Sequence, residues 1–193
     1  ARTVLLTINL DSIGHMSCNP AIGGLAKGQL AREVDALGGE MGRVIDATGI
    51  QFRMINTSKG PAMHSPRAQA DKKAYSQEMK RRLEVQENLS LRQGVVSDLI
   101  VEDGRVGGVR TASGLEYRSD VVILTTGTFL QGVLHFGDWQ TVGGRMGELS
   151  ADDLSPSLEA AGLELGRLKT DTPPRVNYKS LDLDALDEQC GDP

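Results

Sequence analysis

The residue most able to do chemistry in this chain is a single thiol near its start, Cys18. Asn19, which follows it, is a preferred N-cap type, and Pro20 suits the first position of a helix. Apolar residues then recur at helical spacing, namely Ile22, Ala26, Leu30, Val34 and Leu37. The sequence therefore predicts a helix from Pro20 to the glycine pair Gly38-Gly39, with Cys18 just before its start.

A thiol in that place has three possible roles. Free amide groups and the positive end of the helix dipole would favour the thiolate, which is the nucleophilic form. The same amides could instead face a phosphate or a flavin. Alternatively, Cys18 is an inert buried thiol, as free cysteines in globular proteins often are.

Composition places the chain among ordinary globular segments. It has 193 residues, of which 39% are hydrophobic and 24% charged, enough for one domain or one and a part. No apolar run approaches the roughly 18 residues that span a bilayer, and no secretory signal opens the chain, so we expect a cytoplasmic protein away from membranes. Cys18 and Cys190 lie in dissimilar contexts and indicate neither a disulfide framework nor a metal site.

Positive charge is concentrated between residues 51 and 82, where eight Lys and Arg stand against two acidic residues. Such a stretch in a chain of net charge −5 could bind an anion or a nucleic acid. The alternative is a solvated helix face, because surface Lys and Arg are common.

The order of predicted elements indicates an α/β fold. Thr3–Ile8 is expected to form a buried strand, a short helix to end at Thr48, and Ile50–Ile55 to form another strand. Ser65-Pro66 would open a long helix to about Glu87. Extended segments are predicted at 89–91, 95–101 and 106–110, with a hairpin turn at 102–105, and a buried parallel strand at 120–128.

In such folds ligands bind at the carboxyl ends of strands. The Cys18 loop, the Lys59-Gly60 loop and the Thr126-Gly127 turn all follow predicted strands, so one ligand could contact all three. The glycine fingerprint GxGxxG, which usually opens a dinucleotide-binding domain, is absent.

Several longer blocks resemble the GidA/MnmG family, whose members modify the wobble uridine of certain tRNAs. These blocks are Ser17–Gly24, Glu33–Met41, Gly49–Arg53, Ser58–Ala62, Arg67–Asp71, Thr126–Leu130 and Gly166–Thr170. The resemblance implies an FAD-binding Rossmann-like parallel sheet of the glutathione-reductase type, with an inserted β-meander at about 89–118. Residues 1–150 would be a partial FAD-binding domain, and residues 151–193 the start of a second, nicotinamide- or substrate-related region.

By the same resemblance the chain is a fragment, lacking an N-terminal GxGxxG strand and helix and a C-terminal portion. We expect the isolated fragment to bind FAD weakly and to be inactive, and the full-length protein to be a homodimer. Family members work with an MnmE-family GTPase to build a carboxymethylaminomethyl-type group at C5 of uridine. They use methylenetetrahydrofolate as carbon donor and NADH as reductant.

The resemblance gives Cys18 a catalytic role, because a thiolate added at C6 of uridine makes C5 nucleophilic. A second family cysteine lies outside this chain, which leaves open which thiol attacks uridine; Cys190 matches no family cysteine. The implied flavin contacts are Ser17, Cys18, Asn19, Gly23, Gly24, Val96, Thr126, Gly127 and Ser150. The implied tRNA contacts are Lys59, Arg67, Lys72, Lys73, Arg81 and Arg82.

Two other functions remain open from the sequence. One is a folate- and FAD-dependent tRNA uridine methyltransferase, against which the Cys18 block argues. The other is a flavin-binding module without chemistry of its own. The chain also departs from the family at Asp171, where the pattern has glycine, so either Asp171 fills a positive-φ turn or the loop differs.

Overall fold

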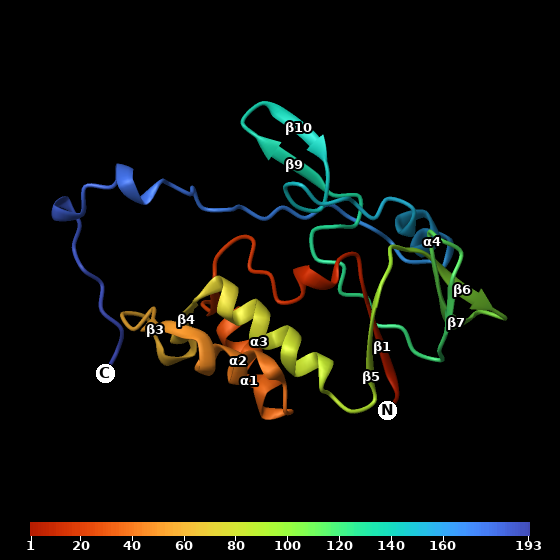
Figure 1. Ribbon diagram of the computed structural model, residues 1–193, viewed down its shortest axis with the longest axis horizontal. Helices are drawn as coiled ribbons and strands as arrows, with labels where there is room; N and C mark the ends of the chain where they lie inside the picture. Colours follow the sequence, from red (N-terminus) through yellow and green to blue (C-terminus); the bar gives the residue numbers. More distant parts are fainter. The chain divides into compact units, whose positions relative to one another are not determined.

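The computed structural model describes all residues, 1–193, and they form two compact units (Figure 1). The first unit contains Ala1–Leu10 and Asn88–Lys169, and the second contains Asp11–Glu87 and Thr170–Pro193. The predicted α/β class is confirmed, since a parallel strand pair, antiparallel sheets and helices are all present. The predicted boundary between residues 150 and 151 stays a prediction.

The first unit is built on a parallel strand pair and an antiparallel meander. The predicted first strand is confirmed as β1 (Thr3–Thr7), which pairs in parallel with β5 (Leu89–Gln93). The expectation that this strand is buried is wrong, because none of its residues is buried and Val4 is 44% exposed. The predicted meander is a three-stranded antiparallel sheet, whose strands are β6 (Val96–Glu102), β7 (Arg105–Thr111) and β8 (Glu116–Arg118). Asp103 and Gly104 both have positive φ in the turn between β6 and β7, as the sequence of that turn predicts.

Helix α4 (Leu154–Ala160) packs on this meander through buried Leu154 and Leu158. The backbone N–H of Leu99 in β6 donates to the Ser157 hydroxyl at 2.8 Å, which joins the helix to the strand. The unit also carries a hairpin, β9 (Val133–Phe136) and β10 (Trp139–Val142).

The prediction of a strand at 120–128 is wrong. These residues form no strand, and the Ile123 side chain is 82% exposed. A strand needs a neighbour to accept and donate its backbone hydrogen bonds, and the described chain supplies none here. An apolar run alone was therefore insufficient to predict a strand.

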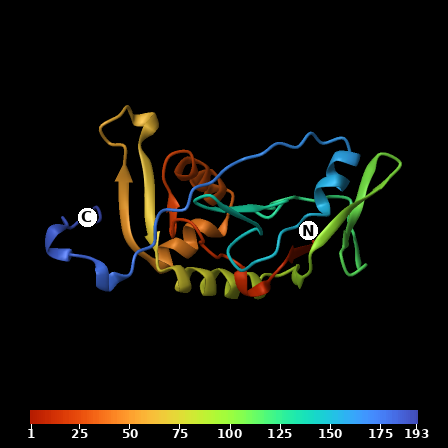
Figure 2. The ribbon, with the colours of Figure 1, turned by 90° about the horizontal axis from the view of Figure 1, so that it is seen from above.

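The second unit is a three-stranded antiparallel sheet with three helices. The strands are β2 (Ala21–Gly23), β3 (Gly49–Ile55) and β4 (Ser65–Ala70), in the order β2-β4-β3. Figure 2 shows β3 and β4 side by side, joined by the loop that holds the short 3₁₀ helix η2 (Pro61–Met63). The helices are α1 (Lys27–Ala36), α2 (Glu40–Thr48) and α3 (Lys72–Glu84).

The core of this unit lies between the sheet and the helices. Val44 of α2 is fully buried, and Tyr75 of α3 and Ile22 of β2 belong to the same cluster. Further 3₁₀ helices are η1 (Leu10–Ser12), η3 (Tyr178–Ser180) and η4 (Leu183–Ala185). The longest helix is α3 with 13 residues, and no helix combines the length and the apolar character needed to cross a membrane.

Both predicted helix starts in this unit are wrong. Residues 21–23, expected in a helix, form β2, and α1 begins only at Lys27. Residues 65–70, also expected in a helix, form β4. Helix α3 starts instead at Asp71, whose carboxylate accepts hydrogen bonds from the backbone N–H groups of Lys73 at 2.9 Å and Ala74 at 3.0 Å. The predicted α2 and β3 are confirmed.

Candidate functional site

Cys18 lies in a loop before β2, separated by that strand from the start of α1, so the helix does not begin at Asn19-Pro20 as predicted. The Cys18 thiol is half-buried and free, and the Cys190 thiol is exposed and also free. Its Sγ donates a hydrogen bond of 2.8 Å to the backbone carbonyl of Asp171. The side chain is therefore neither fully enclosed nor unpartnered.

A segment from the C-terminal part of the second unit lies against this loop. In addition to the Asp171 carbonyl at Cys18, the Nη2 of Arg175 donates to the Ser17 carbonyl at 2.7 Å. Asp171 has no positive φ, so the alternative that it fills a left-handed turn is wrong. The backbone conformation at this position is one that any residue type can adopt. The backbone carbonyl of Asp171, and not its side chain, accepts the hydrogen bond from the thiol.

Lys27, which sequence reasoning missed, contacts the backbone that follows Cys18. Its Nζ donates to the carbonyl of Ala21 at 3.0 Å. Burial lowers the pKa of Lys27, and the nearby charge of Cys18 acts in the opposite direction. Lys27 is the first residue of α1, where a cation is unfavourable because it opposes the helix dipole. This unusual placement is a signal in the sequence, but it is visible only once the true start of α1 is known.

The two glycines proposed as flavin contacts have different surroundings. A Cβ added at Gly23, where φ is +111°, would lie 2.0 Å from the carbonyl oxygen of Pro66, so this glycine permits β2 to approach β4 closely. At Gly24, φ is +92° and no atom lies within 4 Å of such a Cβ. The Gly24 backbone is therefore open to a ligand on that side, although its N–H donates to Pro66 at 2.9 Å. Asn19 is exposed.

The remaining flavin candidates belong to the first unit. Gly127, at φ +56°, also has open space where a Cβ would be, and the Thr126 carbonyl beside it accepts from the Phe129 N–H at 3.0 Å. Val96 begins β6 opposite Thr111 and is half-buried.

Ser150 has a structural role that the sequence did not reveal. Its hydroxyl accepts from the Gly132 N–H at 2.7 Å and donates to the Phe129 carbonyl at 3.0 Å. The guanidinium of Arg145 lies 4.8 Å from the centre of the Phe129 ring. The single hydroxyl proton of Ser150 is thus already donated to the Phe129 carbonyl and is not available to a ligand.

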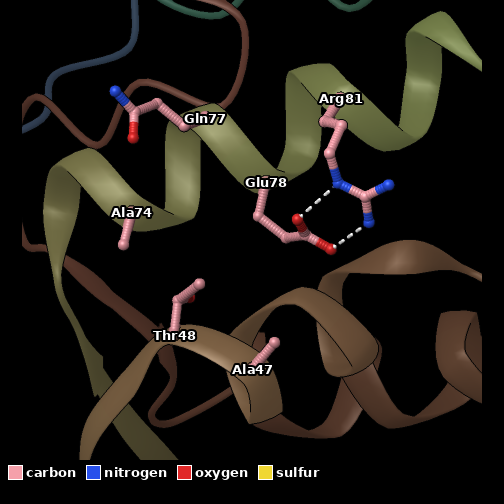
Figure 3. Close-up of a pocket in the computed structure, with 6 residues that line it drawn as sticks. All are labelled: Ala47, Thr48, Ala74, Gln77, Glu78 and Arg81. Carbon is pink, nitrogen blue, oxygen red and sulfur yellow. Dashed lines mark hydrogen bonds and ion pairs between the residues drawn. The ribbon is translucent and has the colours of Figure 1, made fainter.

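Two of the six candidate tRNA contacts already have acidic partners. Figure 3 shows Arg81 beside Glu78 on α3, above the shallow groove that α3 forms with α2. Arg82 donates to the same Glu78 at 2.7 Å and to Glu40 of α2 at 2.8 Å. Hydrogen bonds from Arg81 and Arg82 lower the pKa of Glu78 to about 2. These guanidinium groups are therefore neutralised within the fold.

Three other candidates carry charge without an ion pair. Lys59 and Lys73 are exposed, and Arg67 lies in β4 directly opposite Arg53 of β3. Like charges directly across two strands repel each other, so an anion between them would be favourable. Lys72, the sixth candidate, is the first residue of α3. No group of three or more His, Cys, Asp or Glu side chains is arranged to hold a metal ion.

Comparison with known proteins decides the family. The family model described as "Glucose inhibited division protein A" matches residues 1–193. The chain belongs to the GidA family. The resemblance inferred from the sequence blocks is thereby confirmed.

Curated GidA relatives carry the name tRNA uridine 5-carboxymethylaminomethyl modification enzyme MnmG. The one from Protochlamydia amoebophila is 56% identical over 192 residues, which are 100% of this chain and 31% of the relative. The one from Rhodopirellula baltica is 59% identical over 202 aligned residues, again 100% of this chain and 31% of the relative. The chain thus spans about a third of the length of these relatives.

Solved structures agree. Aquifex aeolicus GidA superposes with a TM-score of 0.92 at 52% identity, covering 99% of this chain and 32% of that one. A GidA-related protein from Thermus thermophilus is more distant, with a TM-score of 0.56 at 25% identity over 82% of this chain and 57% of that one. The fold described above is therefore that of a part of GidA.

Proposed function

We propose that this chain is part of a tRNA-modifying enzyme that acts at C5 of the wobble uridine, in the manner named for its GidA relatives. The observation that carries the proposal is the match of the whole chain, at 56% and 59% identity, to two proteins named MnmG. A flavin-binding module without chemistry is less favoured, because the Cys18 thiol is only half-buried and so is not a fully enclosed, inert cysteine.

Cys18 is proposed as a nucleophile or acid–base group toward uridine. As nucleophile, its thiolate would form a bond to C6 of the ring, and the electron pair of the C5–C6 double bond would move toward O4. C5 then attacks the one-carbon unit, loses its proton, and the S–C6 bond breaks. The thiol proton, now donated to Asp171, must first pass to water, because a carbonyl cannot keep it.

Backbone groups of the candidate flavin residues are proposed to contact FAD. The open backbones at Gly24 and Gly127 fit a group that approaches the main chain closely. Ser17, Cys18, Asn19, Gly23, Val96 and Thr126 remain proposed backbone contacts. Ser150 fits less well as a direct contact, because its hydroxyl is used in the loop at 129–132. When bound, FAD would supply the redox chemistry that links methylenetetrahydrofolate and NADH to the carbon transfer.

The proposal includes the partners and location that the family implies. They are tRNA, an MnmE-family GTPase, a second copy of the full-length chain, and the cytoplasm. Among the candidate tRNA contacts, Arg67, Lys59 and Lys73 fit phosphate binding better than Arg81 and Arg82, since only the latter two are ion-paired to Glu78. Lys72 stays in the proposal as a further contact.

Replacement of Cys18 tests the catalytic part of the proposal. In the full-length protein we expect Cys18→Ser to lower tRNA modification by at least about 10³-fold while FAD absorbance is retained. The matched control is Cys190→Ser, which we expect to keep full activity because that thiol is exposed and has no family counterpart. Wild-type modification by Cys18→Ser would contradict the proposal.

A further inference from the structure

Residues 189–192 are docked on the outer edge of β3. The sheet order β2-β4-β3 leaves that edge of β3 without a neighbouring strand. There the backbone N–H of Asp192 donates to the Phe52 carbonyl at 2.8 Å, and the Met54 N–H donates to the Asp192 carboxylate at 2.5 Å. Figure 1 and Figure 2 both show this end of the described chain beside β3. Asp192 therefore takes the place of a strand residue next to Arg53, with its carboxylate accepting the hydrogen bond that a backbone carbonyl would accept.

Two further contacts hold the docked residues on β3. The side-chain amide of Gln51 donates to the Gln189 carbonyl at 2.6 Å. Gly191 lies close to the strand, since a Cβ added there would be 3.0 Å from the carbonyl oxygen of Phe52. A larger residue at position 191 would therefore push the docked residues away from β3. The docking thus depends on three hydrogen bonds and on one position that requires a small residue.

Asp192 extends a row of charged residues that crosses the sheet. Arg53 of β3 lies opposite Arg67 of β4, which in turn lies opposite Gly23 of β2. Side chains alternate along a strand, so both arginines are on the face opposite to that of Ala68, which packs into the core. Both arginines are half-buried, and neither forms an ion pair. Two like charges directly across neighbouring strands repel each other, so this face favours an anion.

The segment that reaches this row is acidic. Residues 180–193 contain five acidic side chains and no Lys or Arg. The carboxylate of Asp192 accepts from the Met54 N–H and forms no ion pair with Arg53 or Arg67, so contact with it does not neutralise either guanidinium. Its negative charge acts through space instead, over a screening length of about 8 Å at physiological salt. The phosphate groups of a nucleic acid would therefore meet both the attraction of the two arginines and the repulsion of this segment.

We propose that residues 182–192 form an acidic strap whose docking on β3 lowers the affinity of Arg53 and Arg67 for tRNA phosphates. Release of the acidic strap from β3 raises that affinity, because its carboxylates then leave the neighbourhood of the arginines. The inference rests on the proposed function, since tRNA is the ligand named there, and it adds Arg53 to the candidate tRNA contacts. Only hydrogen bonds break when the acidic strap is released, and no covalent step is involved.

Hydrogen exchange in the full-length protein measures the docking without any tRNA. The double variant Gln51→Ala with Gly191→Ala weakens two contacts of the acidic strap and changes no charge. We expect the Met54 N–H to exchange at least about 5-fold faster in this variant, because its acceptor leaves the edge of β3 more often. Gln69→Ala is the matched control. Gln69 lies opposite Gln51 on β4, away from the outer edge, so Gln69→Ala should leave the Met54 exchange rate at the wild-type value.

Binding of bulk tRNA at low salt by the same full-length variants measures the effect on phosphate affinity. We expect the double variant to bind about 2- to 5-fold more tightly than wild type, with a gain that shrinks as salt is added. The gain should vanish when Arg53→Ala is also present. It should persist when Arg32→Ala is present instead, because Arg32 is an exposed residue of α1 outside the row.

The inference is overturned if the Met54 N–H of the double variant exchanges at the wild-type rate, or if it exchanges faster while tRNA affinity stays unchanged or falls. A gain in affinity that survives Arg53→Ala would also overturn it. If the double variant does not fold, Asp192→Ala, which removes the acceptor of the Met54 N–H, decides by the same two measurements.

The proposed function is tested separately by tRNA modification in Cys18→Ser. Faster exchange and tighter tRNA binding in the double variant, together with full modification by Cys18→Ser, would retain the acidic strap and refute the catalytic role of Cys18. The reverse pair of results would retain the catalytic role and refute the acidic strap.

Discussion

The Sγ of Cys18 donates a hydrogen bond of 2.8 Å to the backbone carbonyl of Asp171. A carbonyl oxygen accepts only from the protonated thiol, so this contact has to break before the thiol proton can leave. The segment that begins at Thr170 must therefore release the sulfur before Cys18 can act as a nucleophile. Arg175, which holds this segment to the Ser17 carbonyl at 2.7 Å, is the group to test.

We expect Arg175→Ala to make Cys18 more accessible. Loss of an exposed hydrogen bond worth about 0.5–1.5 kcal/mol should raise the alkylation rate of Cys18 about 2- to 10-fold. The measurement is made at pH 9.5, where an ordinary thiol is mostly ionised and the rate reports access more than charge. Lys179→Ala, on the same segment but without a contact to Ser17, is the control. Equal rates in the two variants would show that Arg175 does not restrain the segment.

Arg67→Ala should weaken tRNA binding more than Arg81→Ala. Arg67 has no ion pair and lies opposite Arg53, whereas Arg81 is bound by Glu78 at 2.8 Å. We expect Arg67→Ala to reduce the slope of log affinity against log salt by about one phosphate contact. The slope for Arg81→Ala should stay near wild type. A larger loss with Arg81→Ala would place the tRNA surface on α3 instead of β4.

Ser150→Ala should destabilise the protein even without flavin. The hydroxyl bonds Gly132 and Phe129 in a half-buried loop, and leaving those groups unpaired costs about 1–3 kcal/mol. Urea unfolding of the flavin-free protein measures this loss. Ser119→Ala is the matched control, since its hydroxyl bonds only the exposed Val121 backbone. If Ser150→Ala lowers FAD affinity with no change in unfolding, the residue is a direct flavin contact.

Alanine at Gly23 should be far more damaging than alanine at Gly24. Both residues have positive φ, but only at Gly23 would the new Cβ overlap a backbone atom, the Pro66 oxygen at 2.0 Å. We expect Gly24→Ala to cost about 1–2 kcal/mol from its backbone conformation alone. Gly23→Ala should in addition separate β2 from β4. Similar melting temperatures for the two variants would refute this packing of the strands.

The ion pairs of Glu78 should make stability pH-dependent in acid. Hydrogen bonds from Arg81 and Arg82 lower its pKa from 4.5 to about 2, so the folded state binds the proton less readily than the unfolded state. The stabilisation is present above pH 4.5 and is lost as pH falls toward 2. Because solvent reaches these ion pairs, we expect Glu78→Gln to lower the melting temperature at pH 7 by only about 1–3 °C.

That difference between Glu78→Gln and wild type should shrink below pH 4.5 and disappear near pH 2. Glu84→Gln is the control, because its ion pair with Lys80 is 4.0 Å long. A difference that stayed constant from pH 7 to pH 2 would show that the glutamine acts through packing and not through charge.

Local patterns predicted those elements whose stability is local. The strand at residues 3–8, the helix ending at Thr48 and the hairpin at Asp103-Gly104 were all confirmed. Each follows from apolar spacing or from turn residues within a few positions. The family, and with it the α/β class, could also be predicted, because whole sequence blocks are shared.

The two wrong helix starts have one common cause. Asn19-Pro20 and Ser65-Pro66 both have the residue types of a helix start, yet the residues after them pair with each other as β2 and β4, with Ile22 opposite Ala68. A pairing between segments this far apart in the chain leaves no trace in either segment alone. Long-range hydrogen bonds therefore replaced two helix turns that local propensity favoured.

The sequence predicted the central residue of the candidate site, Cys18, but not the residues that surround it. Cys18 was evident from the sequence, but the segment at residues 170–175 that contacts its loop is far away in the chain, and its approach depends on tertiary structure. Likewise, the sequence could not show that Glu78 already binds Arg81 and Arg82, since the geometry depends on side-chain placement on α3 and α2. Contacts of this kind are decided by packing.

The parallel pairing of β1 with β5 also bears on synthesis of the chain. Thr3 pairs with Leu89, so β1 leaves the ribosome long before its partner exists. At typical rates of translation the interval is on the order of ten seconds. During that interval the backbone groups of Thr3–Thr7 lack the strand that accepts and donates their hydrogen bonds, while residues 11–87, which build β2, β3, β4 and three helices, emerge. Of the paired strands described above, β1 waits longest for its neighbour, so its unpaired edge is open to pairing with other chains for the longest time.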